Sequence, residues 1–361
     1  MRELWHAAGR SAADANKRRV AFLGLLLSTP VLLIGALVSN LLGGYGVAGL
    51  ERPLGYVLAP LQRAYAADAD LALLGYLALQ ALLLAVLWSF YGTALHRLAA
   101  VDLTQGRRES TDGAYAFAAR HWRGVLGSKI ALFAGILVPL ALALAFNHLA
   151  RIDGWLGGVF LAVAIVLTVV LVSLAVFVLI AWLVGGMLTT PVIATEDSDS
   201  FDALSRAIGY AGAGLPRLTL WRIAFLGGAL LGSAWRAVRL VLLLALAYAV
   251  LRLGAGEEAI DRVHRILQAS DAPTGADRLE LGWADRLAAA VAGFTLFFLV
   301  TGWIADLIAR IACARTGLYL ALRAAVDKLP RDHLASAPDA PAFEDAETAG
   351  FEEVARVGQA E

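Results

Sequence analysis

Residues 156–187 form an apolar run that contains no charged side chain at all. About 20 apolar residues are enough for a helix to cross the hydrocarbon core of a bilayer. A soluble domain would have to bury this entire run, and the chain has too few charged residues to cover such a core. Only 17% of its residues are charged, against about 25% in soluble domains. The sequence therefore predicts an integral membrane protein.

Six apolar runs, this one included, are each long enough to cross a bilayer. They cover residues 20–42, 71–95, 125–146, 156–187, 218–253 and 287–322. Because the backbone must satisfy its own hydrogen bonds in hydrocarbon, runs of this length are predicted to be helices. We expect an all-α integral membrane bundle, with residues 1–19 as an N-terminal segment and residues 20–328 as a six-span membrane domain. Residues 329–361 are acidic and poor in apolar side chains, which predicts a disordered tail.

The distribution of Lys and Arg near the span ends predicts the orientation. One side carries Lys17, Arg18, Arg19, Arg97, Arg107, Arg108, Arg120, Arg123, Arg323, Lys328 and Arg331. The short loops on the other side carry only Arg52, Arg63 and Arg151. With an even number of spans, both termini are predicted to be cytoplasmic, in the inner membrane of a bacterium.

Two short amphipathic segments are expected on the cytoplasmic surface. In the first, Tyr115, Ala119 and Trp122 share a helical face, and in the second, Phe201, Leu204 and Ile208 do so. Each follows Ser, Thr and Asp residues that are good helix N-caps. Both are predicted to be interfacial helices with their apolar faces in lipid. Their shared plan indicates an internal repeat, as in many helical transporters, although the match is one of pattern without identity.

Three of the runs, residues 156–187, 218–253 and 287–322, are longer than a membrane span requires. The run from residue 218 to 253 would make a helix of about 54 Å, well beyond the roughly 30 Å of hydrocarbon. We expect the helices of the last two runs to tilt and to protrude from the membrane. The alternative is that they break, and in the fifth run the break would lie at Gly227-Gly228 or Gly232-Ser233. Pro191 is expected to end the fourth helix. The outer loop, residues 254–286, is expected to contain a short helix at 257–268.

Two stretches carry a resemblance to known proteins. They are Pro191-Val-Ile-Ala-Thr-Glu196 with the following Ser200-Phe-Asp-Ala-Leu-Ser-Arg206, and the closing Gly317-Leu-Tyr-Leu-Ala-Leu-Arg323. This pattern is similar to that of bacterial polytopic membrane proteins such as the membrane domains found with glycerophosphodiester phosphodiesterases. The resemblance covers a small part of the chain, and the soluble phosphodiesterase domain has no counterpart here. It implies a fold and not an activity.

Charged residues inside the apolar runs are the sharpest candidates for a site, because each is costly in a membrane unless paired or hydrated. Arg236 and Arg239 lie in the fifth run, and Asp306 and Arg310 lie in the sixth. Asp306 and Arg310 are spaced i, i+4, which permits an ion pair on one helical face. One interpretation is a ligand site for an anion such as a lipid phosphate. The other is structural, with Asp306 neutralising an arginine whose side chain extends to the interface.

No catalytic signature is present in the chain. The histidines have no metal-binding spacing, the single Cys313 excludes an internal disulfide, and no nucleophile elbow or phosphate-binding loop occurs. No metal or cofactor is expected. A net charge of +0 argues against a nucleic-acid partner. We expect a non-enzymatic scaffold or accessory subunit that binds membrane lipids or another membrane protein. The alternative is a transporter or channel for a small anionic or lipid-like substrate.

Overall fold

The computed structural model describes residues 2–42, 71–149, 151, 155–213, 215–269 and 283–328, and the strand-free fold within them is all-α. Nine α-helices lie in this part of the chain. They are α1 (Arg2–Ser11), α2 (Ala15–Leu42), α4 (Leu71–Gln105), α5 (Thr111–Leu149), α6 (Trp155–Gly185), α7 (Thr189–Glu196), α8 (Ser200–Ala213), α9 (Leu215–Ala269) and α10 (Trp283–Val326). The predicted all-α class is confirmed. The predicted tail, 329–361, lies outside the described residues.

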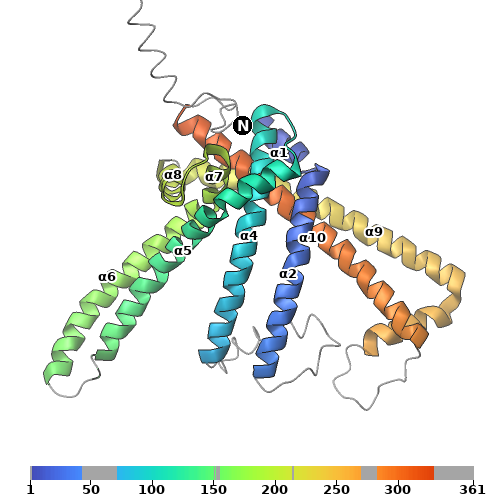
Figure 1. The fold of residues 1–361 in the computed structure, drawn as a ribbon, viewed down its shortest axis with the longest axis horizontal. Coiled ribbons are helices and arrows are strands. Elements are labelled where there is room, and N and C mark those ends of the chain that lie inside the picture. The colour runs from blue at the N-terminus through green and yellow to red at the C-terminus, as the bar shows by residue number, and fades with distance from the viewer. Residues whose placement is uncertain are drawn as a thin grey trace, which may run out of the picture.

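Six of the helices are long and apolar enough to cross a membrane: α2, α4, α5, α6, α9 and α10. They coincide with the six predicted runs, so the chain is a multi-pass membrane protein. The spans pack as neighbours, with α5 along α6, α9 along α10, and α2 beside both α4 and α10. In Figure 1 the pairs α2–α4, α5–α6 and α9–α10 converge near the N-terminus and diverge towards the other end of the molecule.

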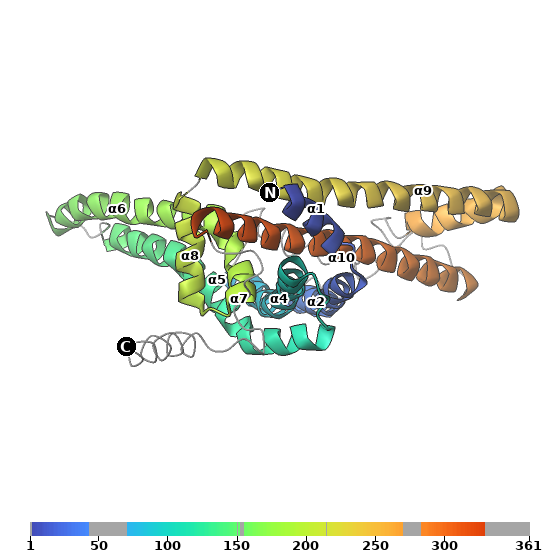
Figure 2. The same ribbon diagram turned by 90° about the horizontal axis from the view of Figure 1, so that it is seen from above.

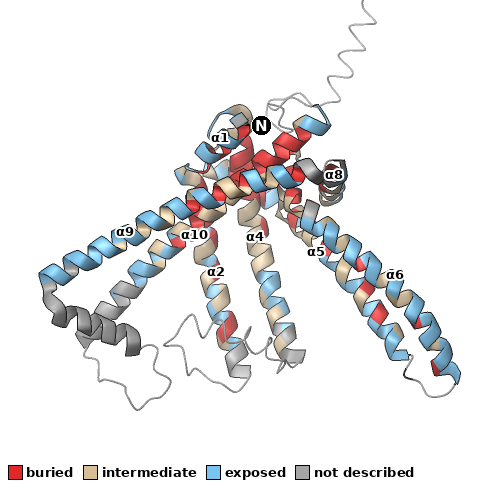
Figure 3. Cartoon of the chain, turned by 180° about the vertical axis from the view of Figure 1, so that it is seen from behind, coloured by how far each residue is buried: buried red, intermediate tan, exposed pale blue. Residues whose placement is uncertain are grey.

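The buried side chains gather where the spans converge (Figure 3). We call this region the hub. It consists of α1, the 3-10 turn η1 (Gly186–Leu188), α7, α8, the C-terminal parts of α4 and α10, and the N-terminal parts of α5 and α9. Viewed from above, α1 and α8 lie across the ends of the spans (Figure 2). The short hub helices bury apolar side chains such as Leu4, Val192 and Ala203 in this region.

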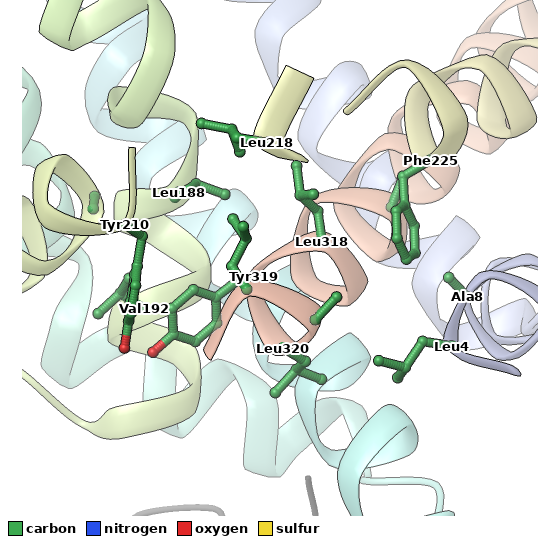
Figure 4. Close-up of a cluster of buried hydrophobic side chains, with 14 of the residues drawn as sticks. Leu4, Ala8, Leu188, Val192, Tyr210, Leu218, Phe225, Leu318, Tyr319 and Leu320 are labelled. Atoms are coloured by element: carbon green, nitrogen blue, oxygen red, sulfur yellow. The ribbon is translucent and has the colours of Figure 1, made fainter. Parts of the chain in front are cut away.

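The largest apolar cluster of the hub joins helices that are distant in sequence. Tyr319 and Leu318 of α10 lie at its centre and are fully buried (Figure 4). Around them pack Leu4, Ala8, Leu188, Val192, Tyr210, Leu218 and Phe225. Burying side chains of this size stabilises the fold by about 1.5–3 kcal/mol each. Beyond the hub the spans expose Leu, Val and Phe, as expected of surfaces that face lipid.

The end of the fourth span differs from the prediction. The helix ends at Gly185 rather than at Pro191, and the chain continues through η1 into α7. Pro191 lies in the first turn of α7, where a missing N–H removes no helical hydrogen bond. A Cβ at Gly185 would lie 2.9 Å from the carbonyl oxygen of Ala207. Glycine therefore allows the end of α6 to contact the backbone of α8.

The expectation of an unbroken fifth helix is confirmed, since α9 is one helix of 55 residues, and the alternative of a break is not realised. A Cβ at Gly228 would lie 2.6 Å from Nε1 of Trp5, and one at Gly232 would overlap the guanidinium of Arg310. These glycines are places of close packing and not helix breaks. Residues 257–268, where a short helix was predicted, are helical and are continuous with α9. The predicted outer loop, 254–286, is correspondingly shorter, and the segment between α9 and α10 lies outside the described residues.

The two predicted surface segments are both helical, but only α8 is a separate helix. Residues 111–123 are continuous with the span in α5. The buried stripe of this segment contains Ala114, Phe117 and Ala118, whereas Ala119 of the predicted face is exposed. Helix α8 buries Ala203, Ala207 and Tyr210 against protein, while Phe201 is 79% exposed. Each segment therefore packs on the hub through a stripe beside the predicted apolar face.

Candidate functional site

Asp306 lies at the centre of a charged cluster between α9 and α10. Its side chain is 1% exposed, its Oδ1 lies 2.6 Å from Nη1 of Arg236, and its Oδ2 accepts a hydrogen bond of 2.8 Å from Nε of Arg310. The ion pair permitted by the i, i+4 spacing of Asp306 and Arg310 is thus formed. Because two guanidinium groups share one carboxylate, the cluster has a net positive charge.

Arg239 does not join this cluster. It is exposed, and its guanidinium carbon lies 5.3 Å from the centre of the Trp235 ring, four residues earlier in α9. This is a cation–π contact within one helix. The structure therefore brings together three of the four predicted residues, Arg236, Asp306 and Arg310, and places Arg239 apart from them.

The packing of α9 on α10 determines where these charges meet. Gly232 leaves room for the guanidinium of Arg310, as a side chain at this position would overlap it. One residue further along α9, the carbonyl oxygen of Ser233 accepts a hydrogen bond of 3.1 Å from Nε1 of Trp303. The two helices are thus held together by this hydrogen bond as well as by the ion pair between Arg236 and Asp306.

The depth of the cluster follows from its proximity to the start of α2. Arg310 lines the same cavity as His6 and Arg10 of α1, the helix that immediately precedes α2. From Arg18 to its end at Leu42, α2 extends for about 36 Å, enough to cross the whole hydrocarbon core. The Asp306 cluster therefore lies near the membrane face from which α2 starts, and not at mid-depth.

A cavity of about 420 Å³ lies beside Arg310, between α1, α9 and α10. Its polar groups come from His6, Arg10 and Arg310, and its apolar wall includes Trp5 and Phe225. Trp5 is anchored by a hydrogen bond of 3.0 Å from its Nε1 to the carbonyl oxygen of Ala224 on α9. Cationic groups beside an apolar wall match the headgroup and upper acyl chain of an anionic lipid.

A second polar network fixes the α7–α8 turn on the end of α10. Glu196 accepts hydrogen bonds from the hydroxyl of Tyr319 and from Arg206, and its Oε1 lies 3.8 Å from Nη1 of Arg323. Arg206 also donates to Asp202, and this hydrogen bond raises the pKa of Arg206. The network has its donors and acceptors paired with one another, which indicates a structural role.

The turn itself requires an unusual backbone. Asp197 has a φ of 53°, in the left-handed region, and closes α7 through a hydrogen bond from its N–H to the carbonyl oxygen of Ile193. Its carboxylate pairs with His121 of α5. On the other side of α8, the hydroxyl of Tyr210 donates to Asp327. Burial, together with this neighbouring carboxylate, raises the pKa of the Tyr210 phenol.

Sequence reasoning missed the contribution of α1 to the cavity. Its residues were treated only as a charged segment before the first span. The signal was present, since Leu4, Ala8 and Ser11 recur at helical spacing and are buried, while Glu3, Trp5 and Arg10 are exposed. Within the described residues, no group of three or more His, Cys, Asp or Glu side chains gathers as metal ligands would.

Comparison with known proteins gives no relative on which to base an assignment: no family model, curated protein or solved structure matches this chain. The resemblance to the membrane domains found with glycerophosphodiester phosphodiesterases therefore stays a prediction. The charged cluster and the cavity beside it are the features of this chain that bear on its function.

Proposed function

We propose that this chain is a non-enzymatic membrane protein that binds an anionic lipid in the cavity beside Arg310 and acts as a scaffold or accessory subunit. The observation that carries the proposal is the composition of that cavity. His6, Arg10 and Arg310 contribute its polar groups, and no acidic side chain is among the described residues that line it. Asp306 is engaged by both Arg236 and Arg310, which leaves the surroundings with an excess of positive charge.

The distribution of charge over the whole chain supports the same location. The hub side carries most of the Lys and Arg residues near the span ends, which is typical of the cytoplasmic side of a bacterial inner membrane. The cytoplasmic leaflet is rich in anionic lipids, and each basic residue near its surface contributes about 1 kcal/mol of attraction. We therefore propose that both termini are cytoplasmic and that the cavity faces the inner leaflet.

Native mass spectrometry of the protein in a neutral detergent, titrated with phosphatidylglycerol or phosphatidylcholine, tests the proposal. We expect a bound phosphatidylglycerol that is lost or about tenfold weaker when Arg10→Gln or Arg310→Gln removes a charge-assisted contact. Arg239→Gln is the matched control, since Arg239 lies on the same helix pair but stacks on Trp235. Equal binding of both lipids, or equal loss in all three variants, would contradict the proposal.

The same preparation separates the competing functions. A second protein that co-purifies in fixed stoichiometry would identify the chain as an accessory subunit. Uptake of a small anion into vesicles that contain the purified protein, abolished by Arg310→Gln and retained by Arg239→Gln, would favour the transporter. In that case the cavity would be part of a transport path and not a resident lipid site.

A further inference from the structure

A second cavity at the hub, of about 370 Å³, lies between α1 and the C-terminal end of α4. Its polar lining comes from both helices and from the turns that follow them, namely Arg10, Ser11, Asp14, Asp102 and Arg108. Among the described residues that line it, none is aromatic, and Leu103 is the single large apolar one. The cavity beside Arg310, by contrast, has an apolar wall that includes Trp5 and Phe225. This second cavity therefore suits a polar molecule and not an acyl chain.

Lys17 of α2 holds the acidic side of this cavity in place. The side chain of Lys17 is 1% exposed, and its Nζ donates to Oδ2 of Asp102 at 2.6 Å and to Oγ of Ser11 at 2.8 Å. The same Nζ lies 3.7 Å from Oδ2 of Asp14. One buried ammonium thus fastens α1, the turn into α2 and α4 to one another. Within the described part of the chain, no donor reaches Oδ1 of Asp102, so this oxygen can accept a hydrogen bond from a ligand.

The turn that ends α4 brings Arg108 to the same cavity. Gly106 has a φ of 64°, in the left-handed region, and its N–H donates to the carbonyl oxygen of Asp102 at 3.1 Å. Glycine adopts this conformation without the steric cost that a side chain would add. The chain therefore leaves the helix sharply after Gln105, and both Asp102 and Arg108 line the cavity.

The two arginines of the cavity are available to a ligand. Arg10 and Arg108 are exposed, and neither side chain forms an ion pair or a hydrogen bond with a described residue. With Lys17, they leave one positive charge in excess over the carboxylates of Asp14 and Asp102. Guanidinium groups bind phosphate oxygens through paired N–H donors, so an oxyanion matches this excess.

The carboxylates add a second requirement for the ligand. A free carboxylate oxygen accepts a hydrogen bond from a hydroxyl group. An ammonium group on the ligand would instead be repelled by Lys17, which already serves both carboxylates. The lining therefore matches a molecule that carries a phosphate together with several hydroxyl groups.

We propose that this cavity binds a small water-soluble sugar phosphate, with Arg10 and Arg108 on the phosphate and Asp102 on a hydroxyl group. The orientation proposed above opens the cavity to the cytoplasm. Arg10 lines both cavities, whereas Arg108 lines only this one and Arg310 only the other. Substitutions at Arg108 and Arg310 therefore test the two sites separately.

Isothermal titration calorimetry of the full-length protein in a neutral detergent tests the proposal with glucose 6-phosphate, inorganic phosphate and glucose. We expect glucose 6-phosphate to bind more tightly than either of the other two. Arg108→Gln should weaken its binding about tenfold, as the loss of one charge-assisted contact implies. The melting temperature of this variant should stay unchanged, because the Arg108 side chain has no partner among the described residues. Arg107→Gln is the matched control, since Arg107 is the adjacent exposed arginine, donates to Gln105 and does not line the cavity.

Four results would overturn the proposal. The first is that the wild type does not bind glucose 6-phosphate, and the second is that Arg108→Gln and Arg107→Gln bind it equally well. The third is that inorganic phosphate binds as tightly as glucose 6-phosphate, which would leave the carboxylates without a role. The fourth is that phosphatidylinositol, which carries the same groups on a lipid, binds through Arg108 while the free sugar phosphate does not. Loss of glucose 6-phosphate binding in Arg108→Gln, with phosphatidylglycerol binding intact, would support the proposal and separate this site from the lipid cavity.

Discussion

Single charges decide the local energetics at the hub, and Asp306 is the clearest example. It is nearly inaccessible and forms ion pairs with two arginines at once. The cost of removing one partner of a buried ion pair exceeds the net contribution of the pair, because the remaining charge is left without compensation. The effect of substituting a residue in such a cluster therefore depends on which buried charges remain without a partner.

For Asp306→Asn we predict a loss of about 2–3 kcal/mol in the free energy of unfolding, since Arg236 and Arg310 would repel each other without their shared carboxylate. Unfolding by sodium dodecyl sulfate, followed by circular dichroism, measures the change. Asp202→Asn is the control, because Asp202 pairs with Arg206 at an exposed site, and we expect a loss below about 1 kcal/mol there. Equal losses in the two variants would refute this account.

Tyr210 gives a prediction about pH. Its phenol pKa in the folded protein lies above the ordinary value of 10.0. The hydrogen bond to Asp327 therefore contributes stability that is fully present below pH 10 and is lost as the pH rises through the folded-state pKa. Tyr210→Phe should lower the unfolding free energy by about 1 kcal/mol at neutral pH. The tyrosinate absorbance of the Tyr210→Phe protein should match that of the wild type up to about pH 11, since Tyr210 of the wild type stays protonated there. An extra ionising tyrosine in the wild type near pH 10 would contradict this.

At the level of elements, the placement of α8 depends on close approach to the end of α6. Gly185 is the residue that permits it, because any Cβ there would press on the backbone of Ala207. The opposite side of α8 is held by Tyr210 and by the Glu196 network. A short helix with so few buried side chains is stable only where several neighbours fix it together.

Gly185→Ala should displace α8 and cost about 1–3 kcal/mol, the usual penalty for overpacking. Gly158→Ala is a matched control in the same helix, because no atom lies within 4 Å of a Cβ at that position. It should be neutral or slightly stabilising, as alanine favours a helix more than glycine does. Thermal unfolding of the two variants in one detergent measures the difference. A Gly185→Ala protein as stable as Gly158→Ala would show that α8 does not pack as described.

At the scale of the whole molecule, burial and membrane contact are divided between two regions. The hub holds most buried side chains. In contrast, none of the residues in an apolar 18-residue stretch of α9 is buried within the chain. Lipid solvates exposed Leu and Val as well as protein does, so the diverging spans do not need one another for apolar contact. The hub, which holds the polar networks, therefore specifies how the spans are arranged.

This topology predicts opposite labelling of two engineered cysteines. The single native cysteine, Cys313, is buried and should react slowly. Arg120→Cys lies near the hub, and Trp155→Cys, where the native side chain is 77% exposed, lies at the far end of the α5–α6 pair. With a membrane-impermeant maleimide, we expect Trp155→Cys to react in right-side-out vesicles and Arg120→Cys to react only in inverted ones. The reverse pattern would place the termini outside, and labelling of both from one side would refute the six-span topology.

The candidate site could be predicted only in part. The spacing of Asp306 and Arg310 indicated their ion pair, because i and i+4 share a helical face. Arg236 on another helix could be named as a charge in a membrane span, but its exact partner depends on how α9 crosses α10.

The sequence by itself determined the helical class, the number of candidate spans and their approximate ends, because a backbone in hydrocarbon has few alternatives to the helix. It also indicated which charges needed explanation. The tertiary structure decided that α9 is unbroken at Gly228 and Gly232, that α6 ends before Pro191, and that Arg236 shares the carboxylate of Asp306 with Arg310. These outcomes depend on contacts between residues remote in the chain, where a glycine can be a break or a place of close packing, and only the neighbouring helix distinguishes the two.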